Sequence, residues 1–105
     1  MTTLYQLLTD EDNGLGLPVA YGYFSTEEKL PFICLMGSGQ DTFKADDTFI
    51  QRKDRTQIEY YFKKKDPAKE NALETLLLNN NYLYTKSEDV YIEDQDVFVI
   101  YYYNV

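Results

Sequence analysis

The stretch TQIEYYFKKKDPAKENALETLLL, residues 56–78, predicts a strand that leads directly into a helix. Apolar and polar side chains alternate over residues 56–63, so one row of the strand can face a core while the other faces outward. Asp66 and Pro67 then mark a helix start, because Asp caps the first turn and Pro suits the first helical position. We expect this helix to run to about Leu78.

The residues before this stretch predict one helix and three strands. The helix is expected over about residues 2–12, where leucines recur at helical spacing. Residues 37–46 are rich in glycine and small polar residues and are expected to form a loop, and Asp54 is expected at a tight turn. The three strands are expected at residues 18–24, 32–36 and about 47–53.

After Leu78 the sequence predicts two more strands, at residues 82–86 and 96–103, separated by an acidic stretch. The predicted order is helix, four strands, helix, two strands. Strands joined by short turns form antiparallel sheets, and two helices can cover only one face of such a sheet. We therefore expect residues 1–105 to form a single α+β domain, with an antiparallel or mixed sheet of about six strands and two helices packed on one face.

The composition argues against catalysis and against tight nucleic-acid binding. The 105 residues include no histidine, the commonest general base and metal ligand. The net charge of -8 disfavours a protein that neutralises phosphates. No spaced ligand set or activated nucleophile is recognisable, so we expect no catalytic residue, no cofactor, no metal and no enzymatic activity. The single Cys34 cannot form an intramolecular disulfide, and no apolar run reaches the length of a membrane span.

Charged residues gather in two segments of opposite sign. One interpretation is two solvated faces that help solubility. The other is that the two groups lie on different edges of the subunit, which favours head-to-tail contacts that close into a ring. The basic group is Arg52, Lys53, Arg55, Lys63, Lys64 and Lys65, and the acidic group is Glu88, Asp89, Glu93, Asp94 and Asp96.

The chain is also rich in aromatic residues, with 11 tyrosines and 6 phenylalanines. Tyrosine suits half-buried strand positions, and it is enriched at protein–protein interfaces. In the last strand, one row consists of Val97, Val99, Tyr101 and Tyr103. This row must be covered by another part of the chain or by another subunit, and we expect a subunit because only two helices are predicted.

Seven segments, in this order, carry a resemblance that covers nearly the whole chain from Leu4 onward. They are GLPVAYGYF (16–24), PFI (31–33), DTFKAD (41–46), QIEYY (57–61), KKKDP (63–67), YIE (91–93) and VFVIYY (97–102). Together they resemble a family of short proteins encoded among the head–tail genes of long-tailed phages and prophages of Gram-positive bacteria. Proteins at that position are usually tail-terminator, tail-completion or head–tail joining proteins.

The resemblance implies a structural virion protein, with a tail terminator as the leading expectation. Its partners would be copies of itself in a ring, often a hexamer, together with the major tail-tube protein and the head connector or stopper protein. DNA would pass through the ring without specific binding, which the negative charge favours. The expected location is the virion tail at the head–tail interface, and the host cytoplasm during assembly, with no membrane association.

We expect the subunit and partner contacts to involve three features. The segment 37–46 is long for a hairpin connection, and Phe43 is its apolar anchor. The charged groups and the outer row of the last strand are the other two. The candidate interface residues are Phe43, Lys44, Asp46, Lys63, Lys64, Lys65, Glu93, Asp94, Tyr101 and Tyr103.

Two other functions compete with this one. An acidic phage-encoded inhibitor that mimics DNA to block a host protein would suit the charge of -8, although the clustered basic residues oppose it. An enzyme is the weaker competitor, because no residue set offers a nucleophile with its base.

Overall fold

The computed structural model describes residues 3–10, 14–22, 24, 29–45, 49–103 and 105, with side chains outside residues 40–54. Both expected helices are present, and each begins at a polar cap. Thr3 and Gln6 form a reciprocal capping box at the first helix, and Asp66 accepts hydrogen bonds from the amides of Ala68 and Lys69 at the second. The elements are α1 (Leu4–Thr9), β1 (Val19–Tyr21), β2 (Phe32–Ala45), β3 (Phe49–Phe62), α2 (Pro67–Asn79), β4 (Thr85–Lys86), β5 (Val90–Ile92) and β6 (Val97–Tyr103).

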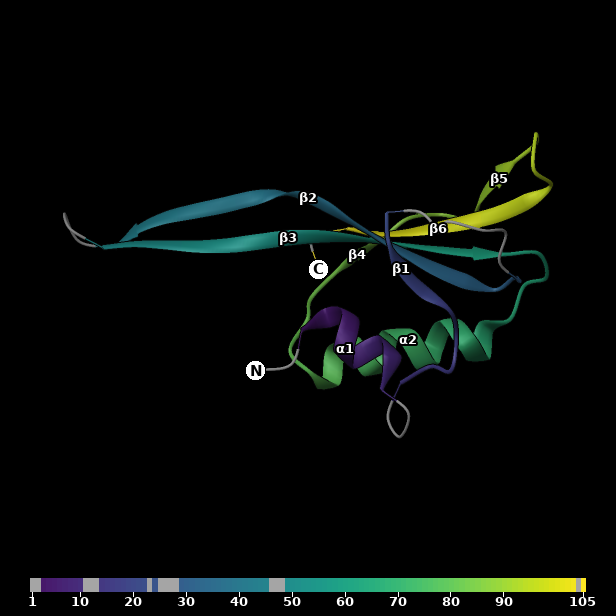
Figure 1. The fold of residues 1–105 in the computed structure, drawn as a ribbon, viewed down its shortest axis with the longest axis horizontal. Coiled ribbons are helices and arrows are strands. Elements are labelled where there is room, and N and C mark those ends of the chain that lie inside the picture. The colour runs from purple at the N-terminus through teal and green to yellow at the C-terminus, as the bar shows by residue number, and fades with distance from the viewer. Residues whose placement is uncertain (1–2, 11–13, 23, 25–28, 46–48, 104) are drawn as a thin grey trace.

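The strands form one mixed, open sheet in the order β1-β2-β3-β6-β4, and β5 also pairs with β6. β1 runs parallel to β2, whereas β2–β3, β3–β6, β4–β6 and β5–β6 are antiparallel. Both helices lie on the same face of the sheet (Figure 1). The expected α+β class, with a six-stranded sheet and two helices packed on one face, is confirmed.

The strand boundaries differ from the prediction at three places. The predicted strands at 47–53 and 56–63 are one strand, β3, and Asp54 pairs with Gln40 instead of forming a turn. Most of the predicted loop at 37–46 belongs to β2, because an irregularity between Gly37 and Gln40 lets the ladder resume beyond it. β5 lies within the acidic stretch, where no strand was predicted, so three strands precede α2 and three follow it.

The extended parts of β2 and β3 project from the body as a two-stranded ribbon (Figure 1). We call residues 37–45 and 49–55 the arm. The C-terminal residue Val105 pairs with Thr56 at the root of the arm, through N–O distances of 3.1 and 3.2 Å. The molecule is therefore elongated, with extents of 51 × 32 × 26 Å.

The core lies between the sheet and the helices. The inward rows of the three long strands alternate with outward residues, as the period of a strand requires. Both helices contribute leucines from one side only. The most deeply buried members are Leu8, Ile33, Leu35, Ile58, Tyr60, Phe62, Leu73, Leu77, Ile100 and Tyr102.

Adjacent leucines of α2 offer a matched test of this packing. Leu77 is 0% exposed and Leu78 is 51% exposed. We predict that Leu77→Ala lowers the free energy of unfolding by about 2–5 kcal/mol, because it leaves a cavity in the core. Leu78→Ala should change it by less than about 0.5 kcal/mol. Urea unfolding followed by circular dichroism measures both, and equal losses would contradict the orientation of α2.

Candidate functional site

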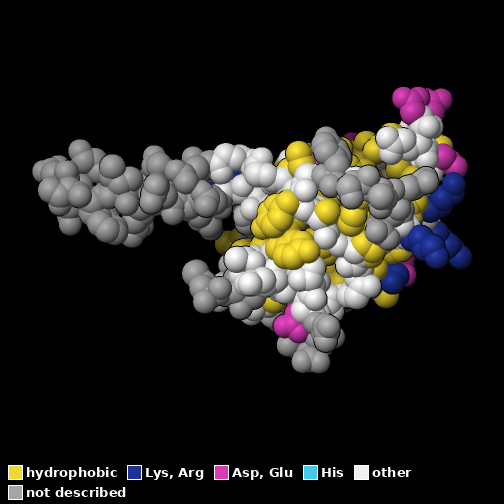
Figure 2. Space-filling model, in the orientation of Figure 1, with side chains coloured by type: hydrophobic (Ala, Val, Ile, Leu, Met, Phe, Trp, Pro, Cys, Tyr) yellow, Lys and Arg dark blue, Asp and Glu magenta, His cyan; other side chains and the backbone are white. Residues whose placement is uncertain are grey.

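Part of the basic group meets the acidic group at one end of the molecule, which we call the charged end. Its lysines are Lys63, Lys64 and Lys65, whereas Arg52, Lys53 and Arg55 lie in the arm. Lys63 Nζ lies 2.8 Å from Asp96 Oδ2, and Lys65 Nζ lies 3.0 Å from Asp89 Oδ2. In Figure 2 the large blue cluster and much of the magenta lie at the end opposite the arm, and a further magenta patch lies on the lower side of the body. The interpretation that placed the two groups on different edges is therefore wrong for these pairs. The reason is the β3–β6 register, which sets Phe62 opposite Phe98 and brings the residues after β3 beside the turn before β6.

A second set of charges ties α2 to the sheet. Glu70 is only 4% exposed, and both its oxygens are close to ammonium groups. Lys65 Nζ lies 2.8 Å from Glu70 Oε2, and Lys86 Nζ lies 3.1 Å from Glu70 Oε1. A buried carboxylate needs such partners, because an unpaired charge in the interior is strongly destabilising. The sequence analysis missed this set, since only the i, i+4 spacing of Glu70 and Glu74 on the helix hinted at it.

Glu74 extends the same network toward β6. Its carboxylate accepts hydrogen bonds from Lys86 Nζ at 2.9 Å and from the hydroxyl groups of Tyr102 at 2.9 Å and Tyr84 at 3.4 Å. Burial alone would raise the pKa of Glu74, but the hydrogen bonds from Lys86 and Tyr102 outweigh it and hold this pKa below its usual value. Burial and the hydrogen bond to Glu74 raise the pKa of Tyr102, so its hydroxyl remains a donor. Lys86 of β4 and Tyr102 of β6 join α2 to the sheet, whereas Lys65 and Tyr84 belong to the segments on either side of α2.

The face of the sheet opposite the helices carries a band of aromatic and apolar side chains. Tyr103 is 37% exposed, whereas Val99 is fully buried beneath its neighbours. The rings of Tyr101 and Tyr103 stack at 5.9 Å, and those of Phe32 and Tyr61 lie 5.1 Å apart. The outer row of the last strand is thus covered in part by this chain itself. We call the remaining half-buried or exposed residues the open face, and they are Phe32, Met36, Tyr61, Val97, Tyr101 and Tyr103.

Nine of the ten candidate interface residues are described, and they fall into three separate places. Phe43 and Lys44 are paired with Gln51 and Ile50 in the arm, and Asp46 lies outside the described residues. Tyr101 and Tyr103 lie on the open face. The remaining five, Lys63, Lys64, Lys65, Glu93 and Asp94, are at the charged end, with the lysines after β3 and the two acids in the turn between β5 and β6.

Three further findings concern metal ligands, membrane-spanning helices and the single thiol. The described residues contain no group of three or more His, Cys, Asp or Glu that could hold a metal ion. They include no helix long and apolar enough to cross a membrane. The sole cysteine, Cys34, is buried, and burial together with the charge of Glu59 raises the pKa of its thiol.

No protein-family model matches this chain, and no curated protein matches it significantly.

The low pKa of Glu74 predicts a loss of stability in acid. A carboxyl group whose pKa is lower in the folded state stabilises the fold above its unfolded pKa of about 4.3. That contribution disappears as the pH falls through the lower folded value. We predict that Glu74→Gln destabilises the protein at pH 7 and weakens the dependence of the unfolding free energy on pH below about 4.5. Glu88→Gln, at an exposed position after β4, is the control. Identical pH profiles for Glu74→Gln and the unaltered protein would contradict this assignment.

Proposed function

We propose that this protein is a structural component of the head–tail junction of a long-tailed phage, and specifically a tail terminator whose copies form a ring on the tail tube. The proposal rests on the sequence resemblance and on one structural observation, the arm. An isolated two-stranded ribbon is at best marginally stable in water, so an arm of this kind gains most of its stability from what it contacts.

None of the described strands pairs with the outer edges of the arm over residues 40–45 and 49–54. Within the described residues, β6 pairs with β3 only over Ile58–Phe62, and Val105 extends the pairing no further than Thr56. On the other side, β1 pairs with β2 only over Ile33–Leu35. Unpaired strand edges are templates for another chain. A neighbouring copy is the occupant that a ring requires, because each subunit then gives one arm and receives one.

The open face is a second candidate surface for contacts between subunits. It is rich in tyrosine, which orders at low entropic cost and is enriched at interfaces. The charged end contributes less than the sequence suggested, because Lys63 and Lys65 are already paired within the subunit. The same ion pairs weaken the alternative that this protein is a DNA mimic. A mimic needs exposed, uncompensated acidic groups, whereas Asp89 and Asp96 are each paired with a lysine of the same chain.

The proposal predicts association that depends on concentration. Analytical ultracentrifugation of the full chain should show a monomer or weak oligomer when dilute and a closed ring when concentrated or mixed with the tail-tube protein of the same genome. A net charge of -8 opposes self-association at low ionic strength, so added salt should favour the ring. A chain that stays monomeric in the presence of the tube protein would contradict the proposal.

Two tyrosines of equal exposure test which face forms the contact. Tyr103 and Tyr5 are each 37% exposed, but Tyr103 lies on the open face and Tyr5 on α1, where it stacks with Tyr21 at 5.6 Å. We predict that Tyr103→Ser weakens association at least tenfold, since a buried interface tyrosine contributes about 1.4 kcal/mol or more. Tyr5→Ser should leave association unchanged. The opposite ranking would place the interface on the helix side.

A further inference from the structure

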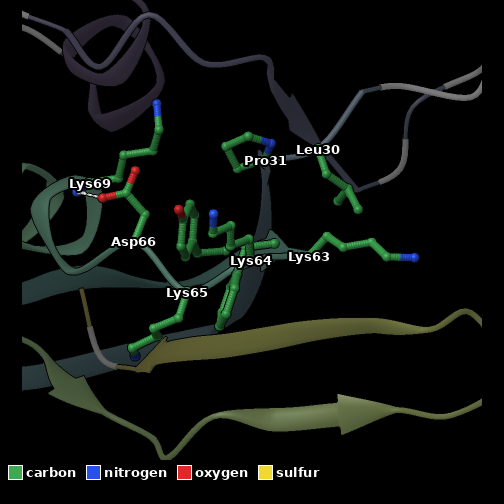
Figure 3. Close-up of a pocket in the computed structure, with 9 residues that line it drawn as sticks. Leu30, Pro31, Lys63, Lys64, Lys65, Asp66 and Lys69 are labelled. Carbon is green, nitrogen blue, oxygen red and sulfur yellow. Dashed lines mark hydrogen bonds between the residues drawn. The ribbon is translucent and has the colours of Figure 1, made fainter.

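A pocket of about 440 Å³ lies where the end of β3 meets the start of α2. Its walls combine apolar and cationic side chains. Leu30 and Pro31 come from the segment before β2, and Phe62 from the end of β3. Figure 3 shows Lys64, Asp66 and Lys69 around the space beside Pro31, with Lys63 extending away from it. The full lining is Leu30, Pro31, Tyr60, Phe62, Lys63, Lys64, Lys65, Asp66 and Lys69.

The positive charge in this pocket is only partly neutralised. Lys63 is paired with Asp96, and Lys65 with Glu70 and Asp89. Among the described residues, no acidic group forms an ion pair with Lys64 or Lys69. The amino-terminal end of α2 adds partial positive charge. Asp66 offsets part of it, because its carboxylate caps the amides of Ala68 and Lys69.

Tyr60 lines the same pocket, and its hydroxyl group lacks a partner. The residue is 1% exposed, and its Oη makes no hydrogen bond with the described residues. A buried hydroxyl without a partner is destabilising, so such groups are uncommon and often mark a place where something else binds. Burial, with the charges of Glu70 and Asp66, raises the pKa of Tyr60 to about 12. The hydroxyl therefore keeps its proton at neutral pH and can donate it in a hydrogen bond.

From these contacts we propose that the pocket binds the phosphate group of a small organic phosphate, held by Lys64, Lys69 and the hydroxyl of Tyr60. A phosphate monoester carries about two negative charges and several acceptor oxygens at neutral pH, which matches two unpaired ammonium groups and one free donor. Separate phosphate oxygens can accept from the two ammonium groups and from the hydroxyl, whereas a carboxylate has only two oxygens. The volume exceeds that of a phosphate alone, so Leu30, Pro31 and Phe62 would contact the organic part. This site does not depend on ring formation.

Inorganic phosphate is the minimal probe, titrated into the full-length protein at constant ionic strength with chloride as the reference. We expect saturable shifts of the backbone amide signals of residues 63–69 in two-dimensional NMR spectra with phosphate, and none with chloride. Tyr60→Phe should raise the dissociation constant at least about tenfold, because it removes one donor to a charged group. The double variant Lys64→Gln, Lys69→Gln should abolish saturation.

Stability measurements separate a binding role from a structural one. Because the Tyr60 hydroxyl has no partner, Tyr60→Phe should leave the melting temperature of the phosphate-free protein unchanged or raise it while weakening phosphate binding. Tyr61→Phe, which loses a hydroxyl on the opposite face, and Lys53→Gln, in the arm, are the controls and should bind phosphate normally. Equal responses to phosphate and chloride, or unchanged binding by Tyr60→Phe, would overturn the proposal.

Discussion

The antiparallel pairing of β3 with β6 fixes the position of almost every other part of the molecule. Ile58 is paired with Tyr102 and Phe62 with Phe98, so the apolar row of each strand lies under the helices. A shift of one residue between them would turn the apolar row of one strand to the opposite face and remove it from the core. Because β3 continues well beyond this paired region, the same strand that completes the core also forms one side of the arm. The core and the arm therefore share one uninterrupted strand.

The charge network of α2 reinforces this arrangement from the helix side. Glu70 and Glu74 are one turn apart on α2 and share Lys86 of β4. Breaking such a buried set is costly, although replacing all of it with apolar residues often is not. In this protein the charge network determines where α2 lies along the sheet, because the lysines hold its two glutamates in place. That position also places the first turn of α2 beside Tyr60, which creates the pocket at the end of β3.

Capping residues and the alternation of apolar and polar side chains correctly predicted the elements that depend on short stretches of sequence. Asp66 and Pro67 gave the start of α2 within one residue, and alternation gave the body of β3 and β6. The strand structure of the arm was missed because glycine and aspartate in residues 37–45 disfavour strands locally, whereas pairing of residues 40–45 with β3 holds this segment in the sheet. β5 was missed because its three residues, Val90–Ile92, are flanked on both sides by acidic residues, which are typical of solvated turns. Lys63 and Asp96 are 33 residues apart, so no local pattern could place them together.

We propose that a neighbouring subunit pairs with the edges of the arm. Hydrogen–deuterium exchange on dilute and on assembled protein tests it most directly, because exchange reports which backbone amides are paired. The account predicts fast exchange of the amides of the arm in the dilute protein and strong protection after assembly, with β6 protected in both states. Arm amides that are already protected in the monomer, or that still exchange fast in the assembled protein, would contradict it.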